Sequence, residues 1–149
     1  MADSQALTSA RVRRDELYDA ILAVERALAA PASGHPVSWS KRVRDDLGEL
    51  RTAFENHIAV TEGSGGLFEE IMSREPRLAH AIERLRVEHR PLLETFETAG
   101  AHLGSVEDEA GVGEIRDTVL ALVHDLFVHR HRGAELLYEA YNVDVSAGD

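Results

Sequence analysis

Apolar residues recur at alternating spacings of three and four positions along most of the chain, the period that keeps side chains on one face of an α-helix. Proline and glycine interrupt this pattern, and no segment alternates as a strand would. The pattern predicts helices at about 8–30, 39–62, 67–73, 76–103 and 114–141. We expect one all-α domain over residues 1–149, with its core at about 8–144. Long amphipathic helices with short connections favour an antiparallel up-down-up-down four-helix bundle.

The composition and charge of the chain argue against several classes of partner and location. The chain carries 27 acidic and 16 basic residues, a net charge of −11, whereas a nucleic-acid-binding protein presents a basic face. No apolar run approaches the roughly 20 residues of a membrane span, and the first residues lack the uncharged core of a signal peptide. Cysteine is absent, which excludes disulfides and thiolate metal ligands. We expect a cytoplasmic protein that binds neither nucleic acid nor membrane.

Three histidines interrupt the apolar faces of three different predicted helices. A core-facing imidazole must find a partner. Three of them in one small helical protein suggest a shared partner, and a metal ion is the obvious candidate. The apolar neighbours are Val43, Leu47, Leu50 and Phe54 for His57, then Leu78, Ile82, Leu85, Leu92 and Phe96 for His89, and Ile115, Val119, Leu122 and Leu126 for His129.

The three histidines are also expected to lie at one height in the bundle. Residues equidistant from a turn face each other in antiparallel helices. With turns centred near residues 74 and 108, His57 faces about residue 91 and His89 faces about residue 127. The heights of the three therefore agree within about 5.4 Å, one helical pitch. The same reasoning brings Arg14, on the apolar face of the first helix, near the height of His57.

Carboxylates near this height complete the candidate site. Glu88 directly precedes His89, and Glu135 follows His131 by one helical turn. Imidazole and carboxylate ligands suit iron, manganese or zinc. The candidate metal ligands are His57, Glu62, His89, His129 and Glu135.

Two further residues are candidates for a role behind the ligands. Arg14 is expected to point into the bundle and to pair with Glu62 or another carboxylate, because isolated burial of its charge would be costly. A guanidinium has no lone pair to offer a metal. An ion pair between Arg14 and a carboxylate would therefore take the place of a metal ligand in the site. Tyr138 is expected to pack in the core or to hydrogen-bond a ligand from behind.

Three segments carry a resemblance to a known family: FENHIAVTEGSGGLFEEI, LRVEHRPLLETF and LFVHRHRGAELLYEAYNVD. Over about residues 15–144 the chain resembles the hemerythrin family, also called the HHE cation-binding domain. The family is a four-helix bundle that holds a non-haem di-iron centre with histidines and bridging carboxylates. The resemblance implies iron in the bundle core and either binding or sensing of O₂, NO or peroxide, or iron handling. Arg14 stands where the family has a histidine, and Thr61 stands at a carboxylate position.

Two functions stay open. The first is a hemerythrin-like metal- or oxygen-responsive protein that is not an enzyme, since no nucleophile beside a base and no phosphate-binding loop is found. The resemblance leaves a di-iron centre open, but any bound metal is expected to be mononuclear or weakly held, because only Glu62 is well placed to bridge two ions. The second is a metal-free structural or regulatory descendant of that fold, in which Arg14 replaces a ligand and the histidines bond to Glu62, Glu135 or Tyr138.

Overall fold

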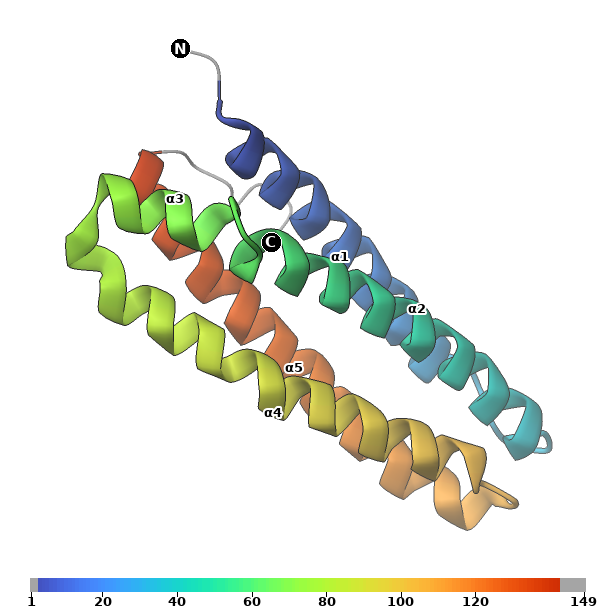
Figure 1. Cartoon of the computed structure of the whole chain (residues 1–149). Helices are drawn as coiled ribbons and strands as arrows, with labels where there is room; N and C mark the ends of the chain where they lie inside the picture. Colours follow the sequence, from blue (N-terminus) through green and yellow to red (C-terminus); the bar gives the residue numbers. More distant parts are fainter. Residues whose placement is uncertain (1–2, 143–149) are drawn as a thin grey trace.

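The computed structural model describes residues 3–142, and these form an all-helical bundle (Figure 1). Over this range no strand is found. The elements, in chain order, are α1 (Gln5–Ala29), α2 (Pro36–Glu62), the short α3 (Leu67–Arg74), the 3₁₀ turn η1 (Pro76–Leu78), α4 (Ala79–Gly104) and α5 (Glu109–Tyr141). The helices expected from the apolar period are therefore present, and the glycines at 63–66 separate α2 from α3 as expected.

The four long helices lie side by side, with α1 along α2 and α4 along α5 (Figure 1). The connections from α1 to α2 and from α4 to α5 lie at one end of the bundle. The short α3 lies at the other end, close to the last turns of α5. This arrangement leaves the middle of the bundle enclosed by helices on all sides, which is where a buried site can form.

Three helices begin earlier than the sequence pattern predicts, and the first of them, α1, begins at Gln5 and not at about residue 8. Pro36 occupies the first turn of α2, where its missing N–H is not needed, so the helix starts before the expected residue 39. Asp108 caps α5 by accepting hydrogen bonds from the backbone N–H groups of Ala110 and Gly111, at 3.1 and 3.3 Å. The stretch up to Gly113, expected as a turn, is consequently helical. This cap gives the first N–H groups of α5 an acceptor, so the helix can begin before the glycines at 111 and 113.

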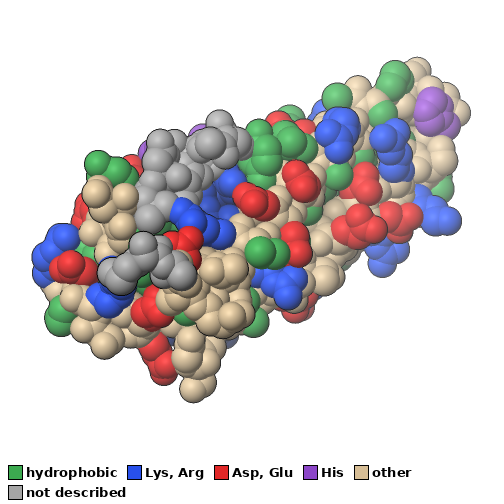
Figure 2. Space-filling view, turned by 90° about the horizontal axis from the view of Figure 1, so that it is seen from above, with side chains coloured by type: hydrophobic (Ala, Val, Ile, Leu, Met, Phe, Trp, Pro, Cys, Tyr) green, Lys and Arg blue, Asp and Glu red, His purple; other side chains and the backbone are tan. Residues whose placement is uncertain are grey.

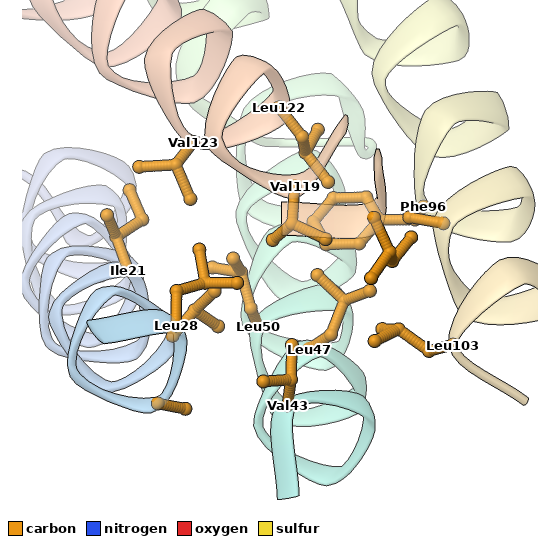
Figure 3. Close-up of a cluster of buried hydrophobic side chains, with 14 of the residues drawn as sticks. Ile21, Leu28, Val43, Leu47, Leu50, Phe96, Leu103, Val119, Leu122 and Val123 are labelled. Carbon is orange, nitrogen blue, oxygen red and sulfur yellow. The ribbon is translucent and has the colours of Figure 1, made fainter. Parts of the chain in front are cut away.

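The apolar core divides into two clusters along the bundle. The larger cluster fills the space between the four long helices, where Leu50, Val119 and Leu122 are fully buried (Figure 3). The smaller cluster lies beneath α3 and includes Phe68 and Ile71. Each buried aliphatic side chain stabilises the fold by roughly 1.5–3 kcal/mol. The two clusters pack the helices together along the bundle.

The outer surface mixes charges of both signs. In the view of Figure 2, acidic and basic side chains are interspersed over the visible face and do not separate into blocks of one sign. Within residues 3–142, none of the helices combines the length and the apolar character that crossing a membrane requires.

Candidate metal centre

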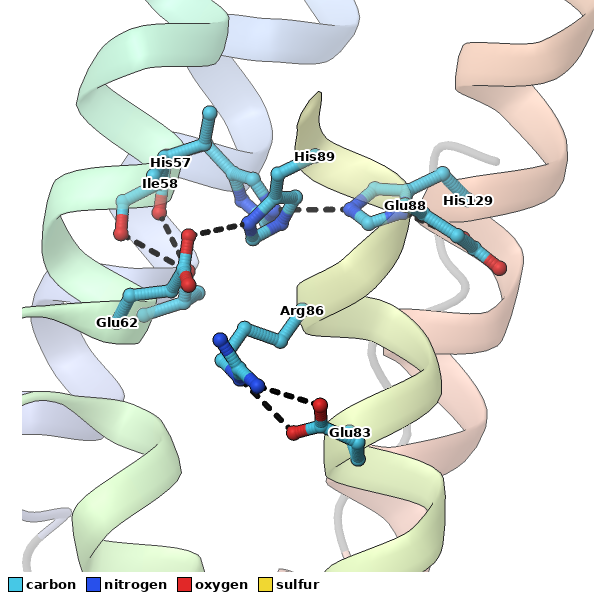
Figure 4. A network of polar contacts seen from close by, with 9 residues as sticks. His57, Ile58, Glu62, Glu83, Arg86, Glu88, His89 and His129 are labelled. Atoms are coloured by element: carbon cyan, nitrogen blue, oxygen red, sulfur yellow. Dashed lines mark hydrogen bonds and ion pairs between the residues drawn. The ribbon is translucent and has the colours of Figure 1, made fainter. Parts of the chain in front are cut away.

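Three buried histidines converge from three helices between the two apolar clusters. His57 comes from α2, His89 from α4 and His129 from α5, and their exposed fractions are 8%, 3% and 2%. Their rings point toward one another in Figure 4. The expectation that the three lie at one height and face inward is confirmed.

The phenyl ring of Phe54 packs against all three histidine rings. Its centroid lies 5.8 Å from the ring of His57, 5.6 Å from that of His89 and 5.9 Å from that of His129. Phe68, from the smaller apolar cluster, stacks on His89 at 6.3 Å. The three imidazoles are thus packed against aromatic rings.

The ring nitrogens of the three histidines lie close enough to share one ion. Each residue offers one nitrogen, and the three nitrogens lie within 4.8 Å of one another. Nε2 of His57 lies 3.3 Å from Nε2 of His129. Two nitrogens bound tetrahedrally at 2.0–2.1 Å from a zinc ion would be separated by about 3.3–3.4 Å. The observed spacing therefore fits two ligands of one ion.

Two carboxylates orient two of these histidines from behind. Glu62 accepts a hydrogen bond from Nδ1 of His89 at 2.7 Å, and Glu88 accepts one from Nδ1 of His129 at 2.7 Å. An ionised carboxylate can only accept, so in both rings Nδ1 carries the proton and Nε2 carries the lone pair. A carboxylate bonded to the far nitrogen of a histidine is the arrangement found behind metal-ligating histidines.

Two buried ring nitrogens have no hydrogen-bond partner among the described residues. One is Nε2 of His89, and the other is Nδ1 of His57, on the opposite side of that ring from the contact with His129. Nε2 of His57 can donate to the lone pair of His129, which leaves the lone pair of His89 without a donor. A buried polar atom without a partner is uncommon and destabilises the fold. An ion at the centre would accept the lone pair that the protein itself leaves unused.

The environment keeps all three imidazoles neutral at pH 7. Burial lowers the pKa of His57 well below its ordinary value, and the neighbouring His129 and His89 lower it further. Burial also lowers the pKa of His89, against the opposing effect of Glu62. The pKa of His129 falls to about 4, because burial outweighs its hydrogen bond to Glu88. Neutral imidazole is the form that binds a metal.

The carboxylates expected as direct ligands lie elsewhere. Glu62 bonds the far nitrogen of His89, so it orients a candidate ligand. It does not belong to the group of converging ligand atoms, which come from the three histidines. The prediction that Glu135 is a metal ligand is wrong. Its side chain is 64% exposed and lies 3.0 Å from Nε2 of His131 at the surface. Six positions along α5 turn the chain by about 600°, which directs Glu135 away from the face of His129. Gly133 does not disturb the helix enough to change this.

The expectation that Tyr138 packs in the core or hydrogen-bonds a ligand from behind is also wrong. Its side chain is 56% exposed. The neighbouring tyrosine on the helix, Tyr141, instead donates a hydrogen bond to Glu70 of α3, which also accepts one from Ser4. These contacts join both ends of the described chain to α3, away from the histidines.

Arg14 lies at the histidine layer, as expected, with an exposed fraction of 4%. Its charge lowers the pKa of His57, and burial lowers its own pKa to about 10. The prediction that Arg14 pairs with Glu62 or another carboxylate is wrong for Glu62, which bonds His89 on another side of the cluster. Nη1 of Arg14 donates to the backbone carbonyl of Arg130 at 2.9 Å. The absence of a side chain at Gly133 makes this approach feasible, since a Cβ there would lie 3.3 Å from Nη1.

Sequence reasoning placed Glu88 at the right height but did not assign it to the site. Its carboxylate supports His129 and also accepts from Arg132. The available signal was its position directly before His89, about 100° around α4 and so able to face the neighbouring helix. The remaining histidines are exposed, namely His35, His80, His102, His124 and His131.

No protein-family model, curated protein or solved structure matches the chain.

Proposed function

We propose that this chain is a hemerythrin-like, up-down-up-down helical bundle that binds one divalent transition-metal ion through His57, His89 and His129. Three buried, neutral imidazoles that converge from three helices are the observation that carries the proposal. Through that ion the protein would bind or sense a small molecule such as O₂, NO or peroxide, or would take part in iron handling. It would act as a binding protein and not as an enzyme.

The supporting carboxylates favour a metal over a simple hydrogen-bond network. Glu62 and Glu88 fix the tautomers of His89 and His129 so that both lone pairs face the same point. A purely structural network would need donors there, whereas a cation needs lone pairs. The two ionised carboxylates also offset the charge of a divalent cation without binding it directly.

The donor set favours one ion over two. A di-metal centre needs carboxylates that bridge the ions, and the cluster within the described residues consists of three histidines. Imidazole ligands suit iron and zinc, and we propose non-haem iron as the ion, with zinc or manganese as alternatives. Three protein ligands leave at least one coordination position for an external molecule.

A second function is favoured by a different observation, the burial of Arg14 beside His57. A fixed positive charge opposes the binding of a cation nearby. In a metal-free descendant of the fold, the 3.3 Å contact between His57 and His129 would be a hydrogen bond between neutral rings, and the layer would serve only to hold the helices together.

Metal analysis separates the two functions. The chain would be expressed in medium supplemented with iron, zinc and manganese, purified without chelator and compared with His89→Ala and with His124→Ala, which removes an exposed histidine from α5. The metal-site proposal predicts about one ion per chain in the wild type and in His124→Ala, and almost none in His89→Ala. Equal metal contents in all three, or no metal in any, would support the metal-free function.

A further inference from the structure

One carboxylate joins a buried histidine of the cluster to an arginine at the surface. Oε1 of Glu88 accepts the hydrogen bond from Nδ1 of His129 at 2.7 Å, and Oε2 of the same carboxylate accepts one from Nη1 of Arg132. The side chains of His129, Glu88 and Arg132 are 3%, 23% and 43% exposed. The three residues therefore form a chain of contacts that leads from the histidine cluster to the solvent.

The other supported histidine, His89, has a carboxylate of the same kind but a different arrangement of arginine. Glu62 accepts the hydrogen bond from its Nδ1. Arg86 lies near Glu62, but its Nε and Nη2 donate to Glu83 (Figure 4). Glu83 is accordingly the main cause that raises the pKa of Arg86, and Glu62 is a minor one. The two supporting carboxylates thus differ, because an arginine bonds Glu88 directly.

We infer that Arg132 is a positioning residue that acts through Glu88 and weakens the donation of His129 to the bound ion. The inference rests on the proposed metal site and concerns how strongly one of its ligands holds the metal. A carboxylate at the far nitrogen raises the basicity of a metal-ligating imidazole. An arginine that bonds the same carboxylate competes for its negative charge. His129 then keeps its Nδ1 proton more fully and donates less through Nε2.

The exposure of Arg132 decides the size and the route of this effect. Arg132 lines a cavity of about 90 Å³ between α4 and α5, together with Glu135 and Glu139. Solvent and salt screen a charge at such a position, so its direct action on a buried ion is weak. The hydrogen bonds through Glu88 are short and partly buried, and they are screened less. The influence of Arg132 should therefore pass mainly through Glu88.

The test combines two measurements on the zinc-loaded protein. Competition against a chromophoric chelator gives the zinc affinity, and NMR of protein with isotope-labelled histidine gives the Nδ1–H resonances of His129 and His89. The test variant is Arg132→Met, which removes the charge and retains an unbranched side chain, and Arg132→Lys restores a charge. Both are also made together with Glu88→Gln. Arg86→Met is the matched control, since Arg86 forms its ion pair with Glu83 at the surface of α4.

We expect Arg132→Met to bind zinc about threefold to fivefold more tightly than the wild type. The Nδ1–H resonance of His129 should move downfield, because its hydrogen bond to Glu88 becomes stronger, while that of His89 stays in place. Arg132→Lys should return both readouts toward the wild type. With Glu88→Gln present, Arg132→Met should change the affinity by less than about twofold. Arg86→Met should leave the His129 resonance unchanged. If Arg132→Met does not fold, Arg132→Gln replaces it.

The other outcomes overturn the inference in distinguishable ways. An unchanged His129 resonance in Arg132→Met would overturn the role through Glu88 and leave the metal site standing. Weaker zinc binding would show that Arg132 only holds Glu88 in place, and would also overturn it. An equal gain in affinity with Glu88→Gln present would assign the effect to charge at a distance. Failure of the wild type to bind zinc would overturn the proposed metal site, and the effect of Arg132 on its affinity with it.

Discussion

Nε2 of His57 lies 3.3 Å from Nε2 of His129, although the two histidines are 72 positions apart in the chain and belong to different helices. Two protonated imidazoles would repel each other at this distance, so the contact requires rings that are at least partly neutral. The pair can then share either a proton or a metal ion. The following predictions distinguish these two states of the same geometry.

Metal should stabilise the fold. An ion that binds the folded chain alone raises the free energy of unfolding by about 2.7 kcal/mol at a free concentration of 100 times its Kd. We expect a higher Tm for the wild type in zinc or iron(II) than in EDTA, measured by calorimetry, and no such difference for His57→Ala. Equal Tm values for the wild type with metal and with chelator would count against the site.

The carboxylates behind the histidines should tune metal affinity without forming part of the ligand set. Replacing Glu88 or Glu62 by Gln should weaken metal binding by about 10–100-fold, because the His129 and His89 rings lose the partners that orient them. Glu135→Gln is the control, since Glu135 bonds His131 at the surface and should not affect affinity. Competition against a chromophoric chelator measures all three. An effect of Glu135→Gln equal to that of Glu88→Gln would contradict the assignment.

Acid should destabilise the metal-free protein through these histidines. The folded chain depresses the pKa of His57, His89 and His129, so between the ordinary value and the folded value the unfolded chain binds more protons. Their contribution to stability is therefore fully present above about pH 6.5 and is lost as the pH falls toward the folded pKa values, about 4 for His129. The slope should be about 1.4 kcal/mol per pH unit for each histidine that stays neutral when folded.

Urea denaturation in EDTA at a series of pH values measures this slope. The control is a variant with all three histidines replaced by Gln, which should lose most of the pH dependence between pH 6.5 and 4. The same slope in the wild type and in the triple variant would assign the pH dependence to other groups.

Replacing Arg14 by His should strengthen metal binding. The substitution removes a positive charge from the histidine layer and adds an imidazole from α1, the one long helix that contributes no histidine to the cluster. We expect higher zinc affinity than in the wild type, measured by the same chelator competition, with Arg14→Gln separating the effect of charge removal from that of the added ligand. Arg14→His that binds zinc no more tightly than Arg14→Gln would show that the new imidazole does not reach the ion.

Much of this structure follows from one-dimensional patterns. The period of apolar residues predicts the helices, and the distances of His57, His89 and His129 from the turns predict that they meet. The start of α5 does not follow from the apolar period, because it depends on Asp108, which satisfies the N–H groups of the first turn.

The finer contacts of the site depend on features that spacing does not encode. Glu88 reaches His129 only because α4 and α5 are rotated so that their facing side chains meet. The acceptor for Arg14 is a helical carbonyl, that of Arg130, and carbonyls do not show in a pattern of side chains. Glu135 and Tyr138 lie near the histidines in sequence, but the turn of α5 directs both outward.

The most direct test of the metal centre is anomalous diffraction from crystals grown with zinc, with data collected at the zinc absorption edge. The structure predicts one strong peak inside the bundle, about 2.0–2.1 Å from a nitrogen of each of His57, His89 and His129. Hydrogen bonds from Glu62 and Glu88 should remain at the far nitrogens of His89 and His129. A map with peaks only at surface carboxylates and exposed histidines, and none among these three rings, would contradict the central claim.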